Sequence, residues 1–443
     1  MVGILKMEGW RLGEARRKKI LPGRHGGDSG RRLVAEYGLA EQFVARCRVC
    51  ARPRLERSGG ALYRRRPGRT SFSRMPSSVA ATVGRINVIL VFGPSGVGKS
   101  TLAWALHRRL SQTMASGFVD TDQIGMCYPT PEGDPGNHRI KVAGLSAIAR
   151  NLSAAGTRVL VVSGMVEDEK TAGFYAEELG FAPHLIRLRA DENVLRARLA
   201  KRAWNLHLTE ASVAHARALD LTGFADIVVE TSGRSVEELV DQLAGELPAG
   251  GFGQPGRAPD ALATGGEASP RIIWIAGVRA VGKSAVAFGV FGRLLRAGQS
   301  AGYVDLAQLG LFAPPEGIRH GQVQAVNLGA VIDLFAQRGT RTIVLSGEAN
   351  DDVLALPVIR RAELELIELR ADREALRDRL RRRSEGGGPP LSGDDLLGMD
   401  ATTIERLAEA EMRDQQGSPL FRVVDSSAQS AEEIASAIVE GLK

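Results

Sequence analysis

The sequence predicts an α/β protein with two tandem domains, each a parallel sheet between two layers of helices. Short apolar runs rich in Val, Ile and Leu alternate with helical patterns, and this alternation occurs twice along the 443-residue chain. The apolar runs lack a strict period of two, as expected for strands that are buried on both faces. Strand–helix alternation with right-handed crossovers gives a three-layer domain.

Residues 1–84 precede the first domain and show no sustained helical or strand period. Residues 1–75 carry 16 Arg and 3 Lys against 6 acids, a net charge of +13, so the rest of a chain with net charge +7 is at −6. Two interpretations are open: a disordered Arg-rich tail, or a stretch upstream of a translation start at Met75. Nucleic acid is expected as a partner only through nonspecific binding to this segment.

The composition predicts a cytoplasmic protein without a membrane partner. No apolar run approaches the roughly 20 residues that a membrane helix needs. Three cysteines are too few for a disulfide framework and fit a reducing compartment.

An internal repeat fixes the domain boundaries. INVILVFGPSGVGKS at 86–100 aligns with PRIIWIAGVRAVGKS at 270–284, and LIRLRADENVLRARLAKR at 185–202 aligns with LIELRADREALRDRLRRR at 366–383. Further matched blocks keep the same order, which indicates a duplicated domain. We expect the first copy at 85–247, a Gly/Pro/Ala-rich flexible linker at 248–270 and the second copy at 271–443.

The first copy has five predicted strands. They are the apolar runs Ile86–Phe92, Gly117–Val119, Arg158–Val162, His184–Leu188 and Asp226–Val229. Helical spacing separates them, for example Leu195 and Leu199 within 191–203.

Each copy contains a complete GxxxxGK[ST] loop between a predicted strand and a predicted helix. Backbone N–H groups of such a loop converge on phosphate oxygens at the positive end of the helix, and the lysine reaches the β- and γ-phosphates. Two tandem P-loop NTPase domains that bind ATP with Mg²⁺ are therefore predicted. The expected nucleotide-binding residues are Gly93, Ser95, Gly96, Val97, Gly98, Lys99, Ser100, Thr101, Gly277, Gly282, Lys283, Ser284 and Ala285.

Acidic residues follow the second strand of each copy. The serine hydroxyl of the loop and the first of these acids are the expected magnesium ligands: Ser100 with Asp120, and Ser284 with Asp305. Asp122, two residues after Asp120, points to the same side and can meet an acceptor hydroxyl. The alternative is that both aspartates only form a turn.

A water-activating acid is missing from the end of the third strand. That strand ends in Ser163-Gly164 in the first copy and in Ser346-Gly347 in the second. Motor and AAA-type ATPases usually carry an Asp there, so this pattern disfavours a hydrolytic ATPase.

The loop and the Asp120-Thr121-Asp122 motif resemble the P-loop small-molecule kinases, such as shikimate, gluconate and adenylylsulfate kinase. The resemblance implies lid and phosphate-clamping roles for Arg198 and Arg202. Arg139 lies in a segment that either binds an anionic or polyhydroxylated acceptor or forms the exposed first turn of a helix. The lid and acceptor signatures of these kinases are not reproduced, so the acceptor stays open.

We therefore expect an ATP-dependent phosphotransferase acting on a small-molecule acceptor. The expected catalytic residues are Lys99, Asp122, Arg139, Arg198 and Arg202. The second copy has Ala307 where the first has Asp122, so we expect it to bind nucleotide without catalysing transfer. The rival hypothesis is a nucleotide-binding sensor in which ATP occupancy changes the domain arrangement and no acceptor is phosphorylated.

Overall fold

The structure is a computed structural model that describes residues 86–201, 208–247, 270–313, 318–387, 392–393, 395–415 and 419–442. The expectations for residues 1–84 lie outside this part, as do those for the linker up to residue 269. The described residues all belong to one compact unit.

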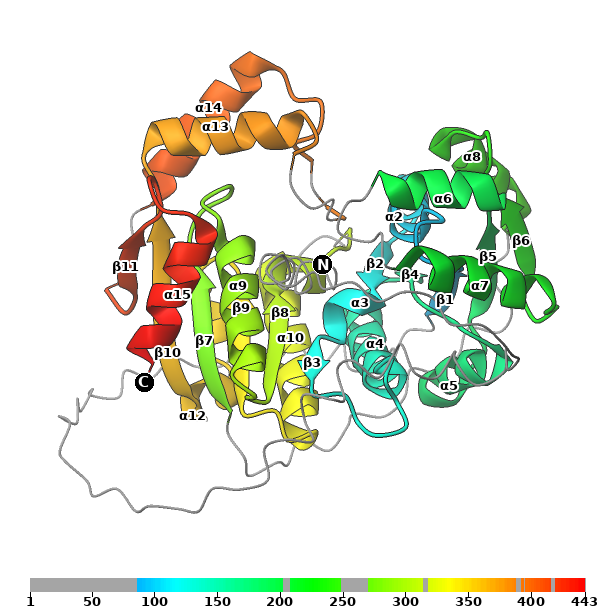
Figure 1. Cartoon of the computed structure of the whole chain (residues 1–443), viewed down its shortest axis with the longest axis horizontal. Helices are drawn as coiled ribbons and strands as arrows, with labels where there is room; N and C mark the ends of the chain where they lie inside the picture. Colours follow the sequence, from blue (N-terminus) through cyan, green and yellow to red (C-terminus); the bar gives the residue numbers. More distant parts are fainter. Residues whose placement is uncertain are drawn as a thin grey trace, which may run out of the picture. The chain divides into compact units, whose positions relative to one another are not determined.

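The first half of the chain forms a sheet of five parallel strands in the order β2-β4-β1-β5-β6 (Figure 1). The five predicted strands all occur, with ends shifted by at most one residue. Their bounds are β1 Asn87–Phe92, β2 Ser116–Asp120, β4 Val159–Ser163, β5 His184–Arg189 and β6 Ile227–Glu230.

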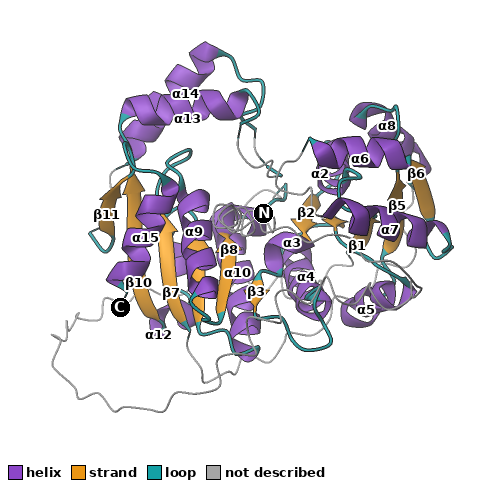
Figure 2. Ribbon diagram, in the orientation of Figure 1, coloured by secondary structure: helices purple, strands orange, loops and turns teal. Residues whose placement is uncertain are grey.

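Helices cover both faces of this first sheet (Figure 2). On one face Ile89 packs in a cluster with Leu106 of α2 and Leu243 of α8, and on the other Leu90 packs with Leu145 of α4. The helices are α2 Lys99–Leu110, α3 Thr121–Ile124, α4 His138–Ala154, α5 Glu169–Leu179, α6 Glu192–Ala200, α7 Thr209–Asp220 and α8 Val236–Glu246. The predicted three-layer arrangement is present in this half.

A second sheet follows, with strands in the order β11-β10-β7-β9-β8-β3. Its five parallel strands repeat the order of the first sheet; they are β7 Arg271–Ala276, β8 Ala301–Asp305, β9 Thr342–Ser346, β10 Glu363–Arg370 and β11 Arg422–Asp425. Its helical elements are α9 Lys283–Arg296, the 3₁₀ turn η5 Leu306–Leu309, α10 His320–Gln337, α11 Asp351–Leu354, α12 Pro357–Arg361, α13 Arg373–Ser384, α14 Ala401–Asp414 and α15 Ala431–Gly441.

The sixth strand of the second sheet comes from the first half of the chain. β3, Cys127–Tyr128, pairs antiparallel with β8 at the sheet edge. The N–H of Tyr303 donates to the carbonyl oxygen of Met126 at 2.8 Å, which extends the pairing by one residue.

The reverse pairing also occurs, between the second half of the chain and the edge strand β2. The N–H of Phe118 donates to the carbonyl oxygen of Leu311 at 2.7 Å, and the N–H of Ala313 donates to that of Ser116 at 3.0 Å. We call 126–128 and 311–313 the exchanged segments. Each of them covers backbone groups that an edge strand would otherwise leave unpaired.

Helices α4 and α10 join the two halves next to the exchanged segments. One continuous hydrophobic cluster runs through both helices. At their contact Asn151 Nδ2 donates to Asn327 Oδ1 at 2.9 Å, and Asn327 Nδ2 donates to the carbonyl oxygen of Leu309 at 2.6 Å. The buried amide of Asn327 thus has partners for its donor and its acceptor, as a buried polar group requires.

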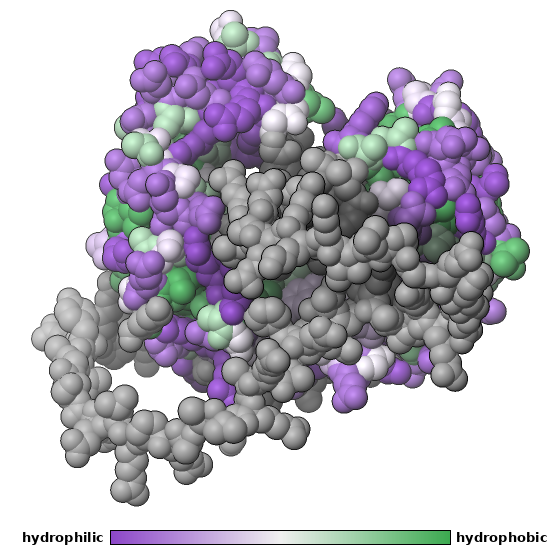
Figure 3. Space-filling model, in the orientation of Figure 1, coloured by the Kyte–Doolittle hydropathy of each residue, from purple (hydrophilic) through white to green (hydrophobic). Residues whose placement is uncertain are grey.

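The helix pair α13 and α14 has a strongly hydrophilic surface (Figure 3). Arg373 lies 3.3 Å from Glu405 and 2.8 Å from Glu409, and these pairs link the two helices across their exposed faces. Exposed ion pairs contribute only about 0–1 kcal/mol each, so this pair of helices depends mainly on the small apolar cluster between them.

Candidate functional site

The first glycine-rich loop joins β1 to α2 through backbone conformations that favour glycine. Gly93, Gly96 and Gly98 have φ angles of 145°, 84° and 108°. A Cβ atom at Gly93 would come within 2.6 Å of the carbonyl oxygen of Leu188, whereas one at Gly98 would meet nothing within 4 Å. Gly98 therefore borders open space, where backbone N–H groups can approach a phosphate.

The N-terminus of α2 has no capping side chain. Its N-cap is Gly98, and its first turn contains no acidic residue. The first N–H groups of the helix and the positive end of its dipole are thus available to an anion. Lys99 Nζ donates to the carbonyl oxygens of Gly93 and Pro94, each at 3.0 Å, which holds the ammonium over the loop.

Helices α6 and α7 contact the outer part of the loop. Ser212 Oγ of α7 donates to the carbonyl oxygen of Ser95 at 2.7 Å. Gly96 lies against Leu199 of α6, where a Cβ would come within 2.8 Å of the leucine side chain. Thr101, in the first turn of α2, is exposed.

Arg198 ties the loop to the end of β6. Its Nη1 donates to the carbonyl oxygen of Val97 at 3.0 Å and to Thr231 Oγ1 at 2.9 Å, and its Nη2 donates to the carbonyl oxygen of Thr231 at 2.9 Å. The guanidinium therefore positions the phosphate-binding loop from behind. The predicted clamping of phosphates by Arg198 stays a prediction.

Two other predicted arginines have different outcomes. The guanidinium of Arg139 lies 4.6 Å from the ring centroid of Phe174 on α5, a cation–π geometry. Its segment does form the first turn of a helix, α4. Arg202 lies outside the described residues, so its predicted role is untested.

The two predicted magnesium ligands of the first half lie together. Ser100 Oγ donates to Asp120 Oδ2 at 2.7 Å and lies 3.1 Å from Ser163 Oγ. Burial raises the pKa of Asp120 to about 6, and the neighbouring carboxylate of Asp122 adds to this effect. A hydroxyl and a carboxylate are hard oxygen ligands of the kind Mg²⁺ prefers, and the cation would offset the cost of the buried charge.

Asp122 forms an ion pair instead of standing alone. Lys141 Nζ of α4 donates to Asp122 Oδ1 at 2.7 Å, with 15% of the lysine and 46% of the aspartate side chain exposed. The lysine charge holds the pKa of Asp122 at about 2. Burial opposes the charge of Lys141, but Asp122 raises its pKa overall. The pair thus keeps a fully ionised carboxylate at the end of β2 beside a buried ammonium.

Glu167 and His215 were not predicted as site residues. Glu167 Oε1 lies 3.5 Å from Nε2 of His138, in the same segment as Arg139, and His215 Nε2 lies 3.2 Å from the carbonyl oxygen of Val166. Burial lowers the pKa of His215, and the charge of Lys99 lowers it further. No motif marks Glu167 or His215, because α7 and the end of β4 come together only in the fold.

The second glycine-rich loop repeats the geometry of the first. Gly277 and Gly282 have φ angles of 140° and 106°, and Gly282 is likewise the N-cap of a helix without a capping side chain. Lys283 Nζ donates to the carbonyl oxygen of Val278 at 2.7 Å. Ala285, in the first turn of α9, lines a pocket with this loop.

The predicted magnesium ligands of the second half also lie together. Ser284 Oγ donates to Asp305 Oδ2 at 2.8 Å, and Ser346 Oγ donates to Ser284 Oγ at 3.3 Å. Burial raises the pKa of Asp305. The hydroxyl–carboxylate set of the first half is therefore present again.

The charged pair Asp122–Lys141 is replaced by a neutral one in the second half. Ala307 stands two residues after Asp305, and its N–H donates to Asp305 Oδ1 at 3.1 Å. Gln324 of α10 lies against the glycine that follows η5, as Lys141 lies against the glycine that follows α3. The second half lacks both the carboxylate and the ammonium of this pair, which indicates that Asp122 and Lys141 act as a unit in the first half.

A family model described as an AAA domain matches residues 88–220. The match spans the first glycine-rich loop, the end of β2 and α7, and it supports nucleotide binding by the first half. It covers less than half of the chain. No curated protein matches the chain.

Several solved structures are similar to about a third of the chain. A tunicamycin resistance protein of Deinococcus radiodurans is 21% identical over 37% of this chain and 95% of its own, with a TM-score of 0.28. A gluconokinase of Sinorhizobium meliloti is 18% identical over 37% and 92%, with a TM-score of 0.28. An APS kinase of Mycobacterium tuberculosis is 17% identical over 37% and 97%, with a TM-score of 0.27. Similarity at this level does not identify what this chain acts on.

Among the described residues there is no group of three or more His, Cys, Asp or Glu side chains that could hold a metal ion. The Ser–Asp pairs of the two loops are the hydroxyl and carboxylate groups that could contact a cation. Within the same residues, no helix is both long and apolar enough to cross a membrane.

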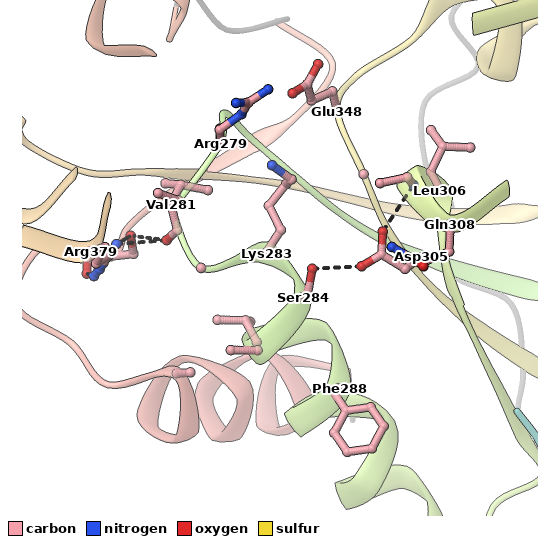
Figure 4. A pocket seen from close by; sticks show the side chains of 18 of the residues that line it. Arg279, Val281, Lys283, Ser284, Phe288, Asp305, Leu306, Gln308, Glu348 and Arg379 are labelled. Carbon is pink, nitrogen blue, oxygen red and sulfur yellow. Dashed lines mark hydrogen bonds between the residues drawn. The ribbon is translucent and has the colours of Figure 1, made fainter. Parts of the chain in front are cut away.

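A pocket of about 1630 Å³ opens over the second loop (Figure 4). Lys283 and Ser284 form its floor, and Asp305 and Gln308 line one side. Arg379 lies on the opposite side, where Nη1 donates to the carbonyl oxygen of Val281 at 2.9 Å. Arg379 thus positions the second loop as Arg198 positions the first. The pocket is larger than the roughly 300–1,000 Å³ of common ligand sites.

Proposed function

We propose that the protein is an ATP-dependent phosphotransferase that acts through the first half of the chain on a small-molecule acceptor. The observation that carries the proposal is the arrangement at the end of β2. There Asp120 contacts Ser100 of the loop at 2.7 Å, while Asp122 contacts Lys141 on the acceptor side at 2.7 Å. A metal-side carboxylate and a separate, ionised acceptor-side carboxylate are the two groups that transfer to a hydroxyl needs.

We further propose that the chain carries two P-loop domains that arose by duplication and that both bind ATP with Mg²⁺. The equal strand orders, the two loops and the two Ser–Asp pairs support this proposal. The Mg²⁺ ions would contact Ser100 and Asp120 in the first half, and Ser284 and Asp305 in the second. The expectation of a cytoplasmic protein stays part of the same proposal.

The reaction forms a bond between the acceptor oxygen and the γ-phosphorus of ATP and breaks the bond from that phosphorus to the β–γ bridging oxygen. Mg²⁺, when bound, neutralises charge on the β- and γ-phosphates. Lys99 stabilises the charge on the transferred group, and Asp122 orients the acceptor hydroxyl and takes its proton. With a pKa of about 2, Asp122 is a weak base. This suits a loose transition state, in which the nucleophile loses its proton late.

The rival function is a nucleotide sensor. A sensor needs the loop and the metal ligands but has no use for an ionised carboxylate on the acceptor side. The pair Asp122–Lys141 therefore favours the transferase. A hydrolase is disfavoured in the first half, since β4 is followed by Gly164 and Met165 without an acid at its end.

The test uses the full-length chain with γ-labelled ATP, Mg²⁺ and a protein-free extract of cell metabolites. Labelled small molecules other than phosphate are separated and counted for the wild type, Lys99→Ala and Asp122→Asn. Lys99→Ala should lose about 10²-fold or more of the transfer by the first half. Asp122→Asn should lose a similar factor while ATP binding, measured by calorimetry, stays within about threefold.

Lys170→Ala is the matched control, because Lys170 is an exposed lysine on α5. It should leave both transfer and binding unchanged. Tight ATP binding without any labelled product in the wild type would instead identify a sensor. Full transfer in Asp122→Asn would remove the acceptor role assigned to this carboxylate.

A further inference from the structure

The second half has a carboxylate that its nucleotide-binding motif does not include. In the second sheet Asp305 at the end of β8 pairs in register with Ser346 at the end of β9. Ala307 and Glu348 each stand two residues beyond these paired positions. The loop after β9 therefore carries an acid at the level where the end of β8 has a methyl group.

The first half shows the opposite arrangement. Asp120 pairs in register with Ser163, and two residues further along stand Asp122 and Met165. Each half thus has one carboxylate at this level, on one or the other of two adjacent strands. Neighbouring strands lie about 4.8 Å apart, so moving the acid from one strand end to the next keeps it beside the same loop.

Glu348 is exposed to the pocket of the second half. Figure 4 shows its carboxylate beside Arg279, on the side of the loop to which the amine of Lys283 extends. Both Lys283 and Glu348 line this pocket. The acid therefore lies near the group that would contact the γ-phosphate.

We propose that the second half is a second phosphotransfer site, in which Glu348 orients and deprotonates the hydroxyl of a neutral or amine-bearing small-molecule acceptor. This proposal departs from the expectation, based on Ala307, that the second half only binds nucleotide. It rests on the proposed function only in that the second loop binds ATP with Mg²⁺.

The chemical step parallels the one proposed for the first half. The acceptor oxygen forms a bond to the γ-phosphorus, the bond from that phosphorus to the β–γ bridging oxygen breaks, ADP leaves, and the hydroxyl proton passes to Glu348. Lys283 stabilises charge on the transferred group. Asp305 and Ser284 stay on the metal side, as their 2.8 Å contact places them together.

The acceptor class follows from the charges around Glu348. Asp351 and Asp352 follow Glu348 in the chain and also line the pocket, and Arg319 lies 3.2 Å from Asp352. Arg279 beside Glu348 also lies 3.2 Å from Asp395. Two arginines against these four carboxylates leave this end of the pocket negative, which repels an anionic acceptor. Gln324 adds a neutral polar group to the lining. A hydroxylated molecule without negative charge fits this end best.

The test isolates the second site in the full-length chain by working in the Lys99→Ala background. γ-Labelled ATP and Mg²⁺ are supplied with the metabolite extract, and phosphorylated small molecules are counted. The proposal expects Lys99→Ala to keep part of the transfer and Glu348→Gln, added to it, to reduce that part by about 10²-fold. ATP binding to the second loop should stay within about threefold.

Glu363→Gln is the matched control, since Glu363 at the start of β10 is a glutamate with 71% of its side chain exposed and it does not line the pocket. It should leave transfer in the Lys99→Ala background within about threefold, because an exposed ion pair contributes little. An equal loss in Glu363→Gln and Glu348→Gln would overturn the role of Glu348. Absence of transfer in Lys99→Ala, with transfer in the wild type, would overturn the second activity and leave the first intact. Transfer that survives Lys99→Ala undiminished and is lost in Lys283→Ala would refute the function proposed for the first half and support this one.

A separate experiment tests the charge of the acceptor. The extract is passed over an anion exchanger at neutral pH, and both fractions are offered to the Lys99→Ala chain. The unretained fraction, which holds neutral and cationic molecules, should support transfer. Transfer with the retained fraction alone would refute the acceptor class. Release of phosphate to water with neither fraction phosphorylated would make the second site a hydrolase and overturn the proposal.

Discussion

Replacing the charged pair of the first site by the neutral pair of the second site separates its catalytic role from its structural one. The double variant Asp122→Ala/Lys141→Gln copies the residues Ala307 and Gln324 of the second half. We expect transfer by the first half to fall by about 10²-fold or more, while the free energy of unfolding falls by about 1 kcal/mol or less.

The expected loss in the free energy of unfolding is derived from the ion pair between Asp122 and Lys141. A pKa of about 2 for Asp122 instead of the ordinary 3.8 corresponds to about 2 kcal/mol at full strength. Since 46% of the Asp122 side chain is exposed, solvent screening reduces this to about 1 kcal/mol. A lowered carboxylate pKa means that this contribution is present above pH 4 and is lost as the pH falls towards 2.

The single variants Asp122→Ala and Lys141→Gln should differ from the double variant in stability or in the pKa of Asp122. Asp122→Ala leaves Lys141, with only 15% of its side chain exposed, beside no carboxylate partner, and an uncompensated buried group costs about 1–3 kcal/mol. Asp122→Ala should therefore be less stable than the double variant. Lys141→Gln frees Asp122 from the charge that lowers its pKa, so its pKa should rise.

Urea unfolding of the full-length chain at pH 7 measures stability, and the γ-labelled ATP assay in a Lys283→Ala background measures transfer by the first half. Transfer by the double variant within about threefold of its parent would refute a catalytic role for the pair. Equal stability of Asp122→Ala and the double variant would show that the ammonium of Lys141 needs no partner.

Three further predictions concern the first half. His107 is buried, and burial lowers its pKa from 6.5 to about 4; stability should thus fall by up to about 3 kcal/mol as the pH drops from 6.5 to 4, and His107→Leu should flatten the pH profile of urea unfolding. Gly98→Ala places a side chain at a φ of 108°, so the loop should change shape and ATP affinity should fall at least about tenfold in calorimetry, at a strain of about 1–3 kcal/mol; unchanged affinity would contradict this. Arg198→Lys cannot make the forked contacts with Val97 and Thr231, so it should weaken ATP binding nearly as much as Arg198→Met, and full rescue by lysine would show that charge alone suffices.

The sequence predicts the fold because its signals are local. Buried strands without alternation and a glycine-rich loop before a helix each depend on neighbouring residues, and five strands of the first half were found this way. The contact between Ser100 and Asp120 follows as well, since the carboxyl ends of all parallel strands of one sheet, here β1 and β2 on either side of β4, lie at the same edge.

The ion pair of Asp122 could not be predicted in the same way. Lys141 is separated from Asp122 by a segment that turns at Asn137, a residue in the left-handed region with φ 53°. Asn137 Nδ2 donates to the carbonyl oxygen of Gly125 at 3.1 Å and to that of Cys127 at 2.8 Å. Only six lysines lie beyond residue 84, which draws attention to Lys141 but does not identify its partner.

Glu348 was missed for a related reason. The third strand of the second half ends in Ser346-Gly347, and Glu348, which follows, belongs to no motif. Only the register between β8 and β9 brings Glu348 to the level of Ala307. The exchanged segments could not be predicted as strands either, because their pairing partners lie in the other half.

The exchanged segments also set the order of events during synthesis. Phe118 of β2 leaves the ribosome 193 residues before Leu311, whose carbonyl oxygen accepts its N–H. At about 5–20 residues per second, the nascent first half waits about 10–40 s with one side of β2 unpaired. An open edge strand is prone to associate with other chains. Chaperone binding is therefore most useful during this interval, while the edge of β2 is unpaired. A chain released early, before residue 311, would keep that edge open for its whole lifetime.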